Sequence, residues 1–451
     1  MNYSSKFICS SPLFFRSYFT MRKNYFLFDE EISPEVFLLY NAFTNDFLLL
    51  NKSKHDLFNN PNVELIEQAD PSFYKKMVEG IFFVPDDYKE LEIVHEIKRK
   101  MMYNSSMYHI LVNTTLDCNL NCWYCYENKV AESRIEKKVI EAIKKNIVYE
   151  YDRARFNVLK VSFFGGEPFL HFEGIKLVLD FAKKFCEERE VELIADFTTN
   201  ATLIDENIIL YLKQFTCHFQ ITLDGDRKVH NKIKKDIHNP NRDTYKDTIK
   251  AIYLANKFIE NKRIAVRINF SNRTLEKIDE IIADIDFLCR KSSFVILKKV
   301  WQIEKEKVNK NLLFEAIQKL FDKGFLVDYY IMPKGCVCFA ERERYALFNY
   351  DGKIFKCSTI SAFNEQNALG TLNFSTGVVS WDLNKQSCWH KSETQKECET
   401  CKWFPVCLGP CGRQLQANKG RFICTFDAMN MTTKEYLIYS YKFHHLRSKM
   451  L

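Results

Sequence analysis

The sequence lacks several features that would each define a class of protein. It has no apolar run approaching the roughly 18–20 residues that a membrane span needs. Residues 7–19 are apolar only in patches, because Ser, Pro and Arg interrupt them, whereas a secretory signal has a cleaner apolar core. A basic stripe with interleaved aromatic residues is also missing, so nucleic-acid binding is not indicated. We therefore expect a cytoplasmic protein that binds neither membranes nor nucleic acids.

The composition is that of a globular protein with more than one domain. Of 451 residues, 46% are hydrophobic and 27% charged, the formal net charge is a modest +7, and no internal repeat occurs. A chain of this length predicts two or three domains. The pattern of residues 1–105 predicts a small α+β unit. Residues 106–330 have the pattern of alternating strands and helices, and residues 331–451 are rich in cysteine.

The alternating middle segment predicts a parallel sheet with crossover helices. The expected strands are 108–116, 158–164, 192–199, 217–224, 264–270 and 293–299. The expected helices include 133–149, 174–189, 244–260, 275–290 and 311–323. Six strand–helix units predict an α/β fold, a partial (β/α)6 barrel related to the TIM barrel, whose active site lies at the C-terminal ends of its strands.

Sixteen cysteines in a cytoplasmic chain favour metal or cluster binding over disulfides. Cys118, Cys122 and Cys125 form a C-x3-C-x2-C group directly after the first expected strand of the barrel. Thiolates are the usual ligands of iron–sulfur clusters, and three ligands leave one iron of a four-iron cluster open for a substrate or cofactor. A zinc site is the alternative, but zinc needs a fourth ligand, and the nearest candidate, His109, lies inside the strand.

The spacing, with an aromatic residue before the last cysteine, resembles the signature of the radical S-adenosylmethionine (radical SAM) enzymes. The segment 161–168, VSFFGGEP, resembles a second strand that runs into the family's GGEP motif. Segments 197–200, 219–225 and 266–270 resemble the ends of the third, fourth and fifth strands, in the expected order. This resemblance implies an enzyme that binds S-adenosylmethionine on a 4Fe–4S cluster held by the three cysteines.

The resemblance also implies which residues contact S-adenosylmethionine. Gly165 and Gly166 would let the backbone approach its methionine part, and Glu167 would accept from its ammonium group, although a helix-capping carboxylate is the alternative. Tyr124 would line the adenine. The remaining polar contacts would come from strand ends and the segment after the fourth strand, namely Asn200, Thr222 and Lys234. Many members of the family have Arg where this chain has Lys234, and a lysine lacks the bidentate fork of arginine.

The C-terminal cysteines resemble the SPASM domain, which follows radical SAM barrels and holds one or two auxiliary 4Fe–4S clusters. By that resemblance, one auxiliary cluster uses Cys338, Cys357 and Cys411. The other uses Cys398, Cys401, Cys407 and Cys424. Cys336 or Cys388 would complete the first cluster, or its remaining iron would be open to substrate. A structural zinc module is the alternative interpretation of this segment.

Members with SPASM domains mostly modify peptides or proteins, so the resemblance implies a peptide or protein substrate and an external electron donor such as flavodoxin or ferredoxin. The expected reaction is hydrogen abstraction by a 5′-deoxyadenosyl radical, leading to a crosslink or another modification. Anaerobic sulfatase maturation is the alternative, but those enzymes carry Asp after the cysteine that corresponds to Cys357, where this chain has Ser358. A non-enzymatic iron–sulfur electron carrier is a further alternative. In peptide-modifying members, a unit like residues 1–105 often precedes the barrel and sometimes grips a leader peptide; the simpler interpretation is that it only covers the barrel.

Overall fold

The computed structural model describes residues 20–300, 307–330, 336–360, 362–386, 389, 395–418 and 422–450. The chain divides into two compact units. The first comprises Met1–Met102, Ile331–Cys338 and Lys391–Tyr441, and the second Tyr103–Tyr330, Phe339–His390 and Lys442–Leu451. Within the described ranges, no helix combines the length and the apolar character that crossing a membrane requires.

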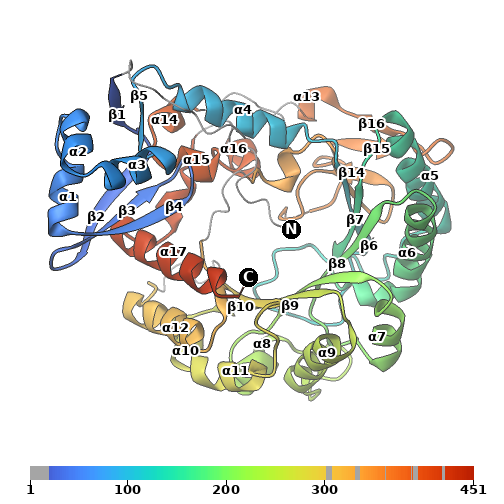
Figure 1. Cartoon of the computed structure of the whole chain (residues 1–451). Coiled ribbons are helices and arrows are strands. Elements are labelled where there is room, and N and C mark those ends of the chain that lie inside the picture. Colours follow the sequence, from blue (N-terminus) through green and yellow to red (C-terminus); the bar gives the residue numbers. More distant parts are fainter. Residues whose placement is uncertain are drawn as a thin grey trace. The chain divides into compact units, whose positions relative to one another are not determined.

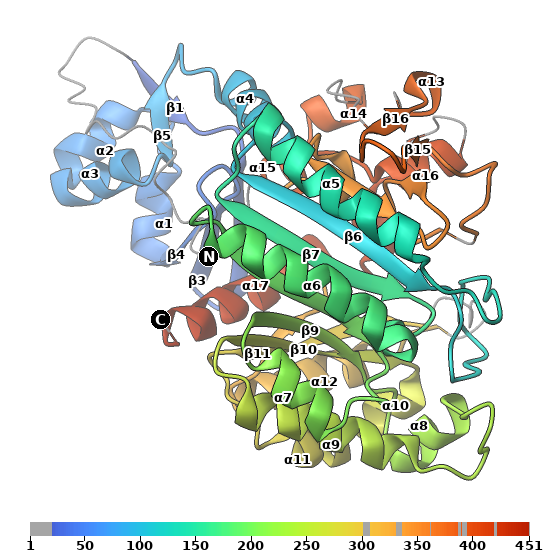
Figure 2. The ribbon, with the colours of Figure 1, turned by 90° about the vertical axis from the view of Figure 1, so that its right-hand side faces the viewer.

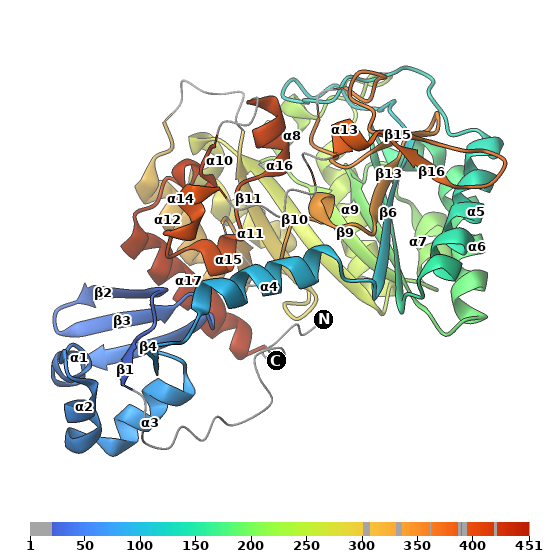
Figure 3. The ribbon, with the colours of Figure 1, turned by 90° about the horizontal axis from the view of Figure 1, so that it is seen from above.

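The first unit is built on a three-stranded antiparallel sheet with helices beside it (Figure 3). The sheet consists of β2 (Leu27–Ser33), β3 (Val36–Asn41) and β4 (Asp46–Asn51), and a separate antiparallel pair is formed by β1 (Met21–Lys23) and β5 (Phe83–Pro85). The helices of this part are α1 (Lys52–Phe58), α2 (Val63–Ala69), α3 (Pro71–Glu79) and α4 (Glu90–Met102). Asn51, Asn62 and Asp70 cap the first three with their side chains.

Both faces of this small sheet are buried, each in a different core. Leu27, Phe37 and Leu39 pack with residues of α1, α2 and α3. Phe28 and Leu38, which alternate with them, pack with apolar residues of the cysteine-rich segment. Because side chains alternate along a strand, a continuous apolar run such as Val36–Tyr40 is what burial on both faces requires.

The cysteine-rich segment of the first unit is a series of short helices. These are α14 (Lys396–Glu399), α15 (Phe404–Cys407), α16 (Gly412–Ala417), the 3-10 turn η3 (Thr425–Ala428) and the longer α17 (Thr433–Ser448), of which residues 433–441 belong to this unit. Trp403 stacks on Phe28 of β2 with ring centroids 3.9 Å apart. Lys402 Nζ donates to Leu27 O at 3.0 Å, and Tyr25 Oη donates to Thr400 O at 2.7 Å. Segments far apart in the sequence therefore share one core.

The second unit contains an eleven-stranded sheet in the order β12-β11-β10-β9-β8-β7-β6-β13-β14-β15-β16. The strands from β12 to β13 are parallel, and β14, β15 and β16 follow as an antiparallel meander. The barrel strands are β6 (Met107–Thr115), β7 (Val158–Gly165), β8 (Glu192–Thr199), β9 (Thr216–Thr222), β10 (Lys262–Phe270), β11 (Ser293–Lys299) and β12 (Leu326–Asp328). The added strands are β13 (Tyr345–Phe348), β14 (Lys353–Phe355), β15 (Gly370–Leu372) and β16 (Val379–Trp381).

Crossover helices line the outside of the barrel strands (Figure 1). They are α5 (Lys137–Arg153), α6 (Phe172–Glu187), α7 (Glu206–Leu212), α8 (Arg227–Ile233), α9 (Thr244–Phe258), α10 (Asn272–Glu276), α11 (Ile278–Ile285) and α12 (Lys310–Asp322). Helices α5 and α6 run along the same side of β6 and β7 (Figure 2). Short helical turns complete the unit: η1 (Pro168–His171), η2 (Phe339–Glu341) and α13 (Leu383–Gln386).

The α/β fold with a central parallel sheet confirms the sequence prediction, and all six predicted strands are present. The sequence analysis missed β12, α7 and α8, because a three-residue strand and seven-residue helices are too short for a clear periodic signal. The predicted helix 275–290 is instead two short helices, α10 and α11.

Aromatic rings fill the layer between the barrel strands and their helices. Phe197 of β8 lies between Phe163 of β7 and Phe219 of β9, with ring centroids 5.5 and 5.3 Å away. Phe169 of η1 adds a third contact at 5.3 Å. All four are buried. These rings fix the spacing of three neighbouring strand ends, where the polar residues predicted for the site lie.

Replacing Phe197 with Ala should therefore destabilise the second unit by about 3–5 kcal/mol, because it leaves a cavity among three aromatic rings. Thermal unfolding followed by circular dichroism would measure the lowered transition. Leu210→Ala on α7 is the control, because 60% of that side chain is exposed and its loss should change the stability by less than about 0.5 kcal/mol. Equal transitions for both variants would contradict this account of the core.

Candidate functional site

The three cysteines of the C-x3-C-x2-C group lie on the loop that leaves the C-terminal end of β6. The base of this loop is closed by hydrogen bonds: Asp117 accepts from the Glu132 amide at 2.9 Å, and Thr115 donates to Ser133 O at 2.6 Å. Asp117 also accepts from the Cys118 amide at 2.8 Å. The loop is thus a closed excursion from the edge of the sheet.

Cys118 and Cys122 are half-buried and Cys125 is exposed. Burial raises the pKa of the Cys118 thiol to about 12, and the negative charge of Glu167 adds to the rise. Desolvation of its sulfur also raises the pKa of Cys125, although the residue as a whole is exposed. A thiol with a raised pKa still loses its proton when a metal ion binds to its sulfur.

Across the described ranges, no three His, Cys, Asp or Glu side chains converge on one point as ligands of a single ion would. A 4Fe–4S cluster makes a different demand, because each cysteine binds a separate iron. Three thiols from one loop, two of them half-buried and one exposed, are compatible with that demand.

Gly165 and Gly166 lie where the turn after β7 touches the cysteine loop. A Cβ atom on Gly165 would come within 2.1 Å of Thr115 O, and one on Gly166 within 2.0 Å of Asp117 O. The Gly165 φ of +115° is in addition a conformation that favours glycine. Both glycines are therefore needed for contact between two backbone segments, a requirement separate from the predicted approach of the cofactor.

Glu167 is completely buried and receives hydrogen bonds from three groups. Thr199 Oγ1 donates to Oε1 at 2.7 Å, the Asn200 amide donates to Oε2 at 2.8 Å, and the Phe169 amide donates to Oε1 at 3.1 Å. It thus caps η1, as the alternative prediction held, and it also ties η1 to the end of β8. Burial raises the pKa of Glu167 despite these donors. A carboxylate has about four acceptor positions, so one position is left for a further donor.

Asn200 connects the end of β8 to the cysteine loop. Its Nδ2 lies 4.0 Å from Cys118 Sγ and donates to Asn119 Oδ1 at 3.0 Å. Asn119 Nδ2 in turn donates to Thr202 Oγ1 at 2.9 Å. The predicted residue Asn200 is therefore adjacent to the first cysteine.

The other predicted residues meet in a buried polar network at the ends of β9 and β10. The Tyr124 hydroxyl donates to Asp224 and accepts from Asn269 Nδ2 at 3.2 Å. Asn269 Nδ2 also donates to Asp224 at 2.9 Å. Lys234 Nζ donates to Thr222 Oγ1 at 2.8 Å and lies 3.4 Å from Asp224 Oδ2. Tyr124, Thr222 and Lys234 are thus brought together by a carboxylate that the sequence analysis did not single out.

The charges in this network balance each other. Burial would raise the pKa of Asp224, but Lys234, His230 and the hydrogen bonds from Tyr124 and Asn269 outweigh burial and lower it. Burial would likewise lower the pKa of Lys234, but Asp224 and its other neighbours raise it well above the usual value. The pair is therefore ionised in the folded protein, and Lys234, predicted as a cofactor contact, has an internal partner.

The sequence analysis missed Asp224, Asn269, Asn119 and Thr202. Asp224 and Asn269 lie inside segments that the resemblance identified, 219–225 and 266–270, so their position at strand ends was available as a signal. Which of several polar residues there point toward one another depends on the register between strands. In the sheet, Arg267 of β10 is paired with Thr222 of β9, and this register brings Asn269 beside Asp224.

Four of the predicted auxiliary-cluster cysteines lie near one another in the first unit. Burial, together with the neighbouring thiols Cys407, Cys401 and Cys424, raises the pKa of Cys398 to about 12. Cys401 and Cys398 are joined by a backbone hydrogen bond of 3.1 Å across one turn. These are the four residues that the SPASM resemblance assigned to one cluster, and their use as ligands stays a prediction.

The other predicted set is divided between the units. Cys338 and Cys411, with the candidate Cys336, belong to the first unit, and Cys357 belongs to the second. Cys388 lies outside the described residues. The assignment of Cys338, Cys357 and Cys411 to one cluster therefore stays a prediction.

Comparison with known proteins identifies the class to which this geometry belongs. Residues 112–285 match the family model of the Radical SAM superfamily. The match begins in β6 and includes the cysteine loop, the turn after β7 and the network at the ends of β9 and β10. Residues 112–285 therefore form a radical SAM domain, and the chain is an enzyme, as the motifs predicted. A radical SAM domain implies S-adenosylmethionine and a 4Fe–4S cluster as cofactors.

The similarity to several curated relatives covers most of each relative's length. The chain is 24% identical over 329 residues to a cysteine-type anaerobic sulfatase-maturating enzyme of Clostridium perfringens, covering 66% of this chain and 86% of the relative. It is 23% identical over 337 residues to the radical SAM cyclopropyl synthase TigE of Paramaledivibacter caminithermalis, covering 68% of each. It is 27% identical over 291 residues to the uncharacterized protein MJ0907 of Methanocaldococcus jannaschii, covering 63% of this chain and 95% of the relative.

A solved structure supports the fold. Native anSMEcpe with bound AdoMet superimposes with a TM-score of 0.51 at 19% identity, covering 76% of this chain and 97% of that one. At this level of identity the likeness establishes the architecture alone.

Gly166→Ala should disrupt the cysteine loop, because its Cβ would collide with the backbone oxygens of Asp117 and Leu116 at 2.0 and 2.8 Å. Backbone atoms cannot move aside as a flexible side chain can, so we expect a loss of stability above the roughly 1–3 kcal/mol typical of overpacking. Denaturant unfolding would measure it. Gly324→Ala is the matched control: the φ of +78° strains it by about 1 kcal/mol, but no atom lies closer than 3.7 Å. A Gly166→Ala protein no less stable than the control would show that the loop can shift freely.

Lys234→Met should leave the Asp224 carboxylate buried without its counter-ion and cost about 3–5 kcal/mol. The double variant Asp224→Asn, Lys234→Met removes both charges and should recover most of that loss. Unfolding free energies of the two single variants and the double variant form the test. Additive losses in the double variant would mean that the two groups do not interact.

Proposed function

We propose that this chain is a radical SAM enzyme that modifies a peptide or protein. The observation that carries the proposal is the cysteine loop with Cys118, Cys122 and Cys125 at the C-terminal edge of the parallel sheet, held by the Gly165–Glu167 turn inside a radical SAM domain. Active sites of such barrels lie at this edge. The donor chemistry of three thiols fits a cluster with one open iron.

The residues of the site have distinct roles in this proposal. Cys118, Cys122 and Cys125 bind the cluster, and the free acceptor position of Glu167 receives the ammonium group of S-adenosylmethionine. When bound, cluster and S-adenosylmethionine together supply a 5′-deoxyadenosyl radical that abstracts hydrogen from the substrate. Tyr124 lines the adenine.

The remaining predicted contacts lie on both sides of the cysteine loop. Asn200 and Thr222, at the ends of β8 and β9, contact the ribose and the methionine carboxylate. Lys234 offers a positive charge for that carboxylate, although Asp224 already neutralises part of it. A lysine shared in this way binds the carboxylate more weakly than the forked guanidinium it replaces.

The proposed substrate class is supported by the relatives. Sulfatase-maturating enzymes and a cyclopropyl synthase are similar to this chain over 86% and 68% of their lengths. The product we propose is a crosslink or a related modification. The cysteines of residues 331–451 would hold auxiliary 4Fe–4S clusters in a SPASM domain, and these clusters would supply a one-electron acceptor for an oxidative modification. An external flavodoxin or ferredoxin supplies electrons, and residues 1–105 bind the leader part of a peptide substrate.

Sulfatase maturation is the second candidate function, favoured by the similarity to the Clostridium perfringens enzyme. Ser358 and Thr359 follow Cys357, where the maturases that the sequence resembles have Asp. Neither hydroxyl is a base of comparable strength at neutral pH. This departure makes another peptide modification the better-supported proposal.

Replacing Cys118, Cys122 and Cys125 together with Ala should abolish formation of 5′-deoxyadenosine and remove about four irons per chain, the content of one 4Fe–4S cluster. The protein would be purified and reconstituted without air, and the product measured by liquid chromatography after reduction. Wild-type protein should contain eight to twelve irons for two to three clusters by the same reckoning, roughly four per cluster. A triple variant that still cleaves S-adenosylmethionine would refute the assignment of the loop.

Substrate class is tested with the same wild-type protein. Peptides encoded beside the gene and a synthetic sulfatase peptide containing the target Cys or Ser would be incubated separately and analysed by mass spectrometry. Modification of a peptide encoded beside the gene, without modification of the sulfatase peptide, supports the proposal. Conversion of the sulfatase peptide to an aldehyde would establish the second candidate instead.

A further inference from the structure

The stretch between Cys118 and Cys122 has a backbone partner outside the cysteine loop. Leu120 forms an antiparallel bridge with Asp236, just after α8. The Asn121 amide donates to Lys235 O at 2.8 Å, and the Ile237 amide donates to Asn119 O at 2.9 Å. Leu120 and Asp236 are both buried. The course of the chain between the first two cysteines is therefore set by the segment 235–237.

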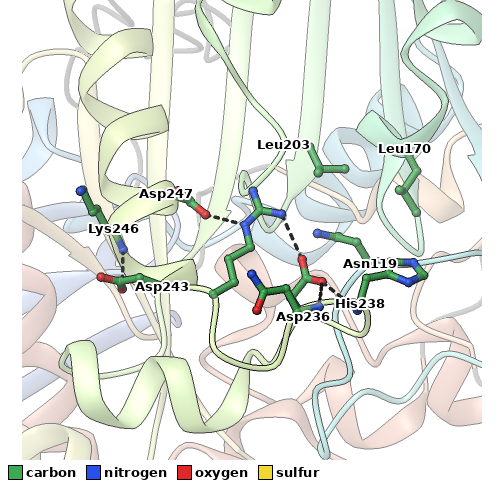
Figure 4. Close-up of a pocket in the computed structure, with 10 residues that line it drawn as sticks. Asn119, Leu170, Leu203, Asp236, His238, Asp243, Lys246 and Asp247 are labelled. Atoms are coloured by element: carbon green, nitrogen blue, oxygen red, sulfur yellow. Dashed lines mark hydrogen bonds and ion pairs between the residues drawn. The ribbon is translucent and has the colours of Figure 1, made fainter.

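The guanidinium group of Arg242 ties that segment to α9 and to the loop after β8, while the other oxygen of Asp236 accepts from the His238 and Asn239 amides at 2.9 and 3.0 Å. Its Nη1 donates to Asp236 Oδ2 at 3.0 Å, its Nε to Asp247 Oδ2 at 2.7 Å, and its Nη2 to Thr202 O at 2.7 Å. The three acceptors come from the segment after α8, from α9 and from the loop after β8. Asp236, Asp247 and Asn119 surround the same cavity of about 670 Å³ (Figure 4).

A second connection leads from Arg242 to the same stretch of the cysteine loop. Thr202, whose carbonyl accepts from Arg242, also accepts from Asn119 Nδ2 at 2.9 Å through its hydroxyl. Thr202 and Asn119 are in turn both bonded to Asn200, whose Nδ2 lies 4.0 Å from Cys118 Sγ. Arg242 thus bonds to both residues that hold the stretch 119–121. Asp236 belongs to the segment that bridges this stretch through the backbone, and Thr202 accepts from the Asn119 side chain.

The chemistry of these contacts calls for arginine. Three acceptors in different directions, two of them carboxylates, match the planar fork of a guanidinium. A lysine ammonium could satisfy one or two of them but not all three with the same geometry. The contacts of Arg242 are all with neighbouring segments, and none of those that the structure describes is with a cysteine.

We propose that Arg242 is a positioning residue for the cysteine loop, setting the placement of Cys118 and Cys122 through Asp236 and Thr202. The assignment of these cysteines as cluster ligands rests on the proposed function; the mechanical link between Arg242 and residues 119–121 does not. Loss of the guanidinium removes the bonds that Asp236 and Thr202 share through Arg242 and leaves only their local bonds, so the stretch opens more often while the sheet beneath it stays intact.

The test is amide hydrogen exchange of the full-length protein as purified, with iron content measured in parallel. In Arg242→Met, the amides of Asn121 and Ile237 should exchange about tenfold faster, since local opening no longer breaks a network of ion pairs. Arg227→Gln is the matched control, because Arg227 pairs with Asp243, the residue next to Arg242, and has no described bond to Asp236 or Thr202. Exchange in the control should equal that of the wild type at both amides.

Two outcomes would overturn the proposal: unchanged exchange at Asn121 and Ile237 in Arg242→Met, or an equal increase throughout β9 and α9, which would indicate a general loss of stability. Arg242→Lys should give an intermediate rate, because it keeps the charge but not the fork. If Arg242→Met does not fold, Asp247→Asn is measured instead and should speed exchange at the same two amides more weakly; no change there would also overturn it.

In the iron-loaded protein, iron should leave Arg242→Met for a ferrous chelator several times faster than it leaves Arg227→Gln, if the loop holds the cluster. Arg242→Met could instead release iron at the wild-type rate while its Asn121 amide exchanges faster. That result would confirm the mechanical link and contradict the ligand role of the loop. The failure of the inference and the failure of the proposed function therefore give different results.

Discussion

The candidate site depends on how closely two backbone turns approach each other at one edge of the sheet. The turn after β7 touches the loop after β6 so closely that neither Gly165 nor Gly166 has room for a Cβ atom. This contact aligns the Glu167 amide with Asp117 O at 2.8 Å and places the Glu167 carboxylate near the first cysteine. A larger separation would remove the carboxylate, the η1 cap and the support of the cysteine loop together.

The same closeness makes buried charge unavoidable, and the fold compensates each charge locally. Glu167 is surrounded by three hydrogen-bond donors, and Asp224 is paired with Lys234. An uncompensated buried charge costs several kcal/mol, so these partners are conditions for having the site at all. They also restrict it: a lysine that neutralises Asp224 has less charge to offer a ligand than an unpaired arginine.

Local patterns in the sequence predicted the barrel, because six strands of the right length alternate with amphipathic helices and each motif falls where a strand ends. They predicted the cysteine loop and the Gly–Gly–Glu turn, because spacing along the chain defines both. The Asp224 network was beyond reach, since it depends on the register that places Asn269 of β10 beside the end of β9. Arg242 was equally hidden: its three acceptors come from three separate segments, and no spacing in the sequence connects it to Leu120.

The first unit illustrates a further constraint that spacing cannot reveal. A segment of very short helices rich in cysteine buries little apolar surface of its own, and such segments usually depend on metals or on a neighbouring core. Here Phe404 and Leu437 complete the face of the β2–β4 sheet that α1, α2 and α3 leave open, and Cys398 is buried in that same core. Cys398 and the three thiols near it are therefore placed by packing on the N-terminal sheet. It follows that residues 20–102 are a structural requirement for this cysteine group, whatever else they bind, because removing them would expose the core on which the group is built.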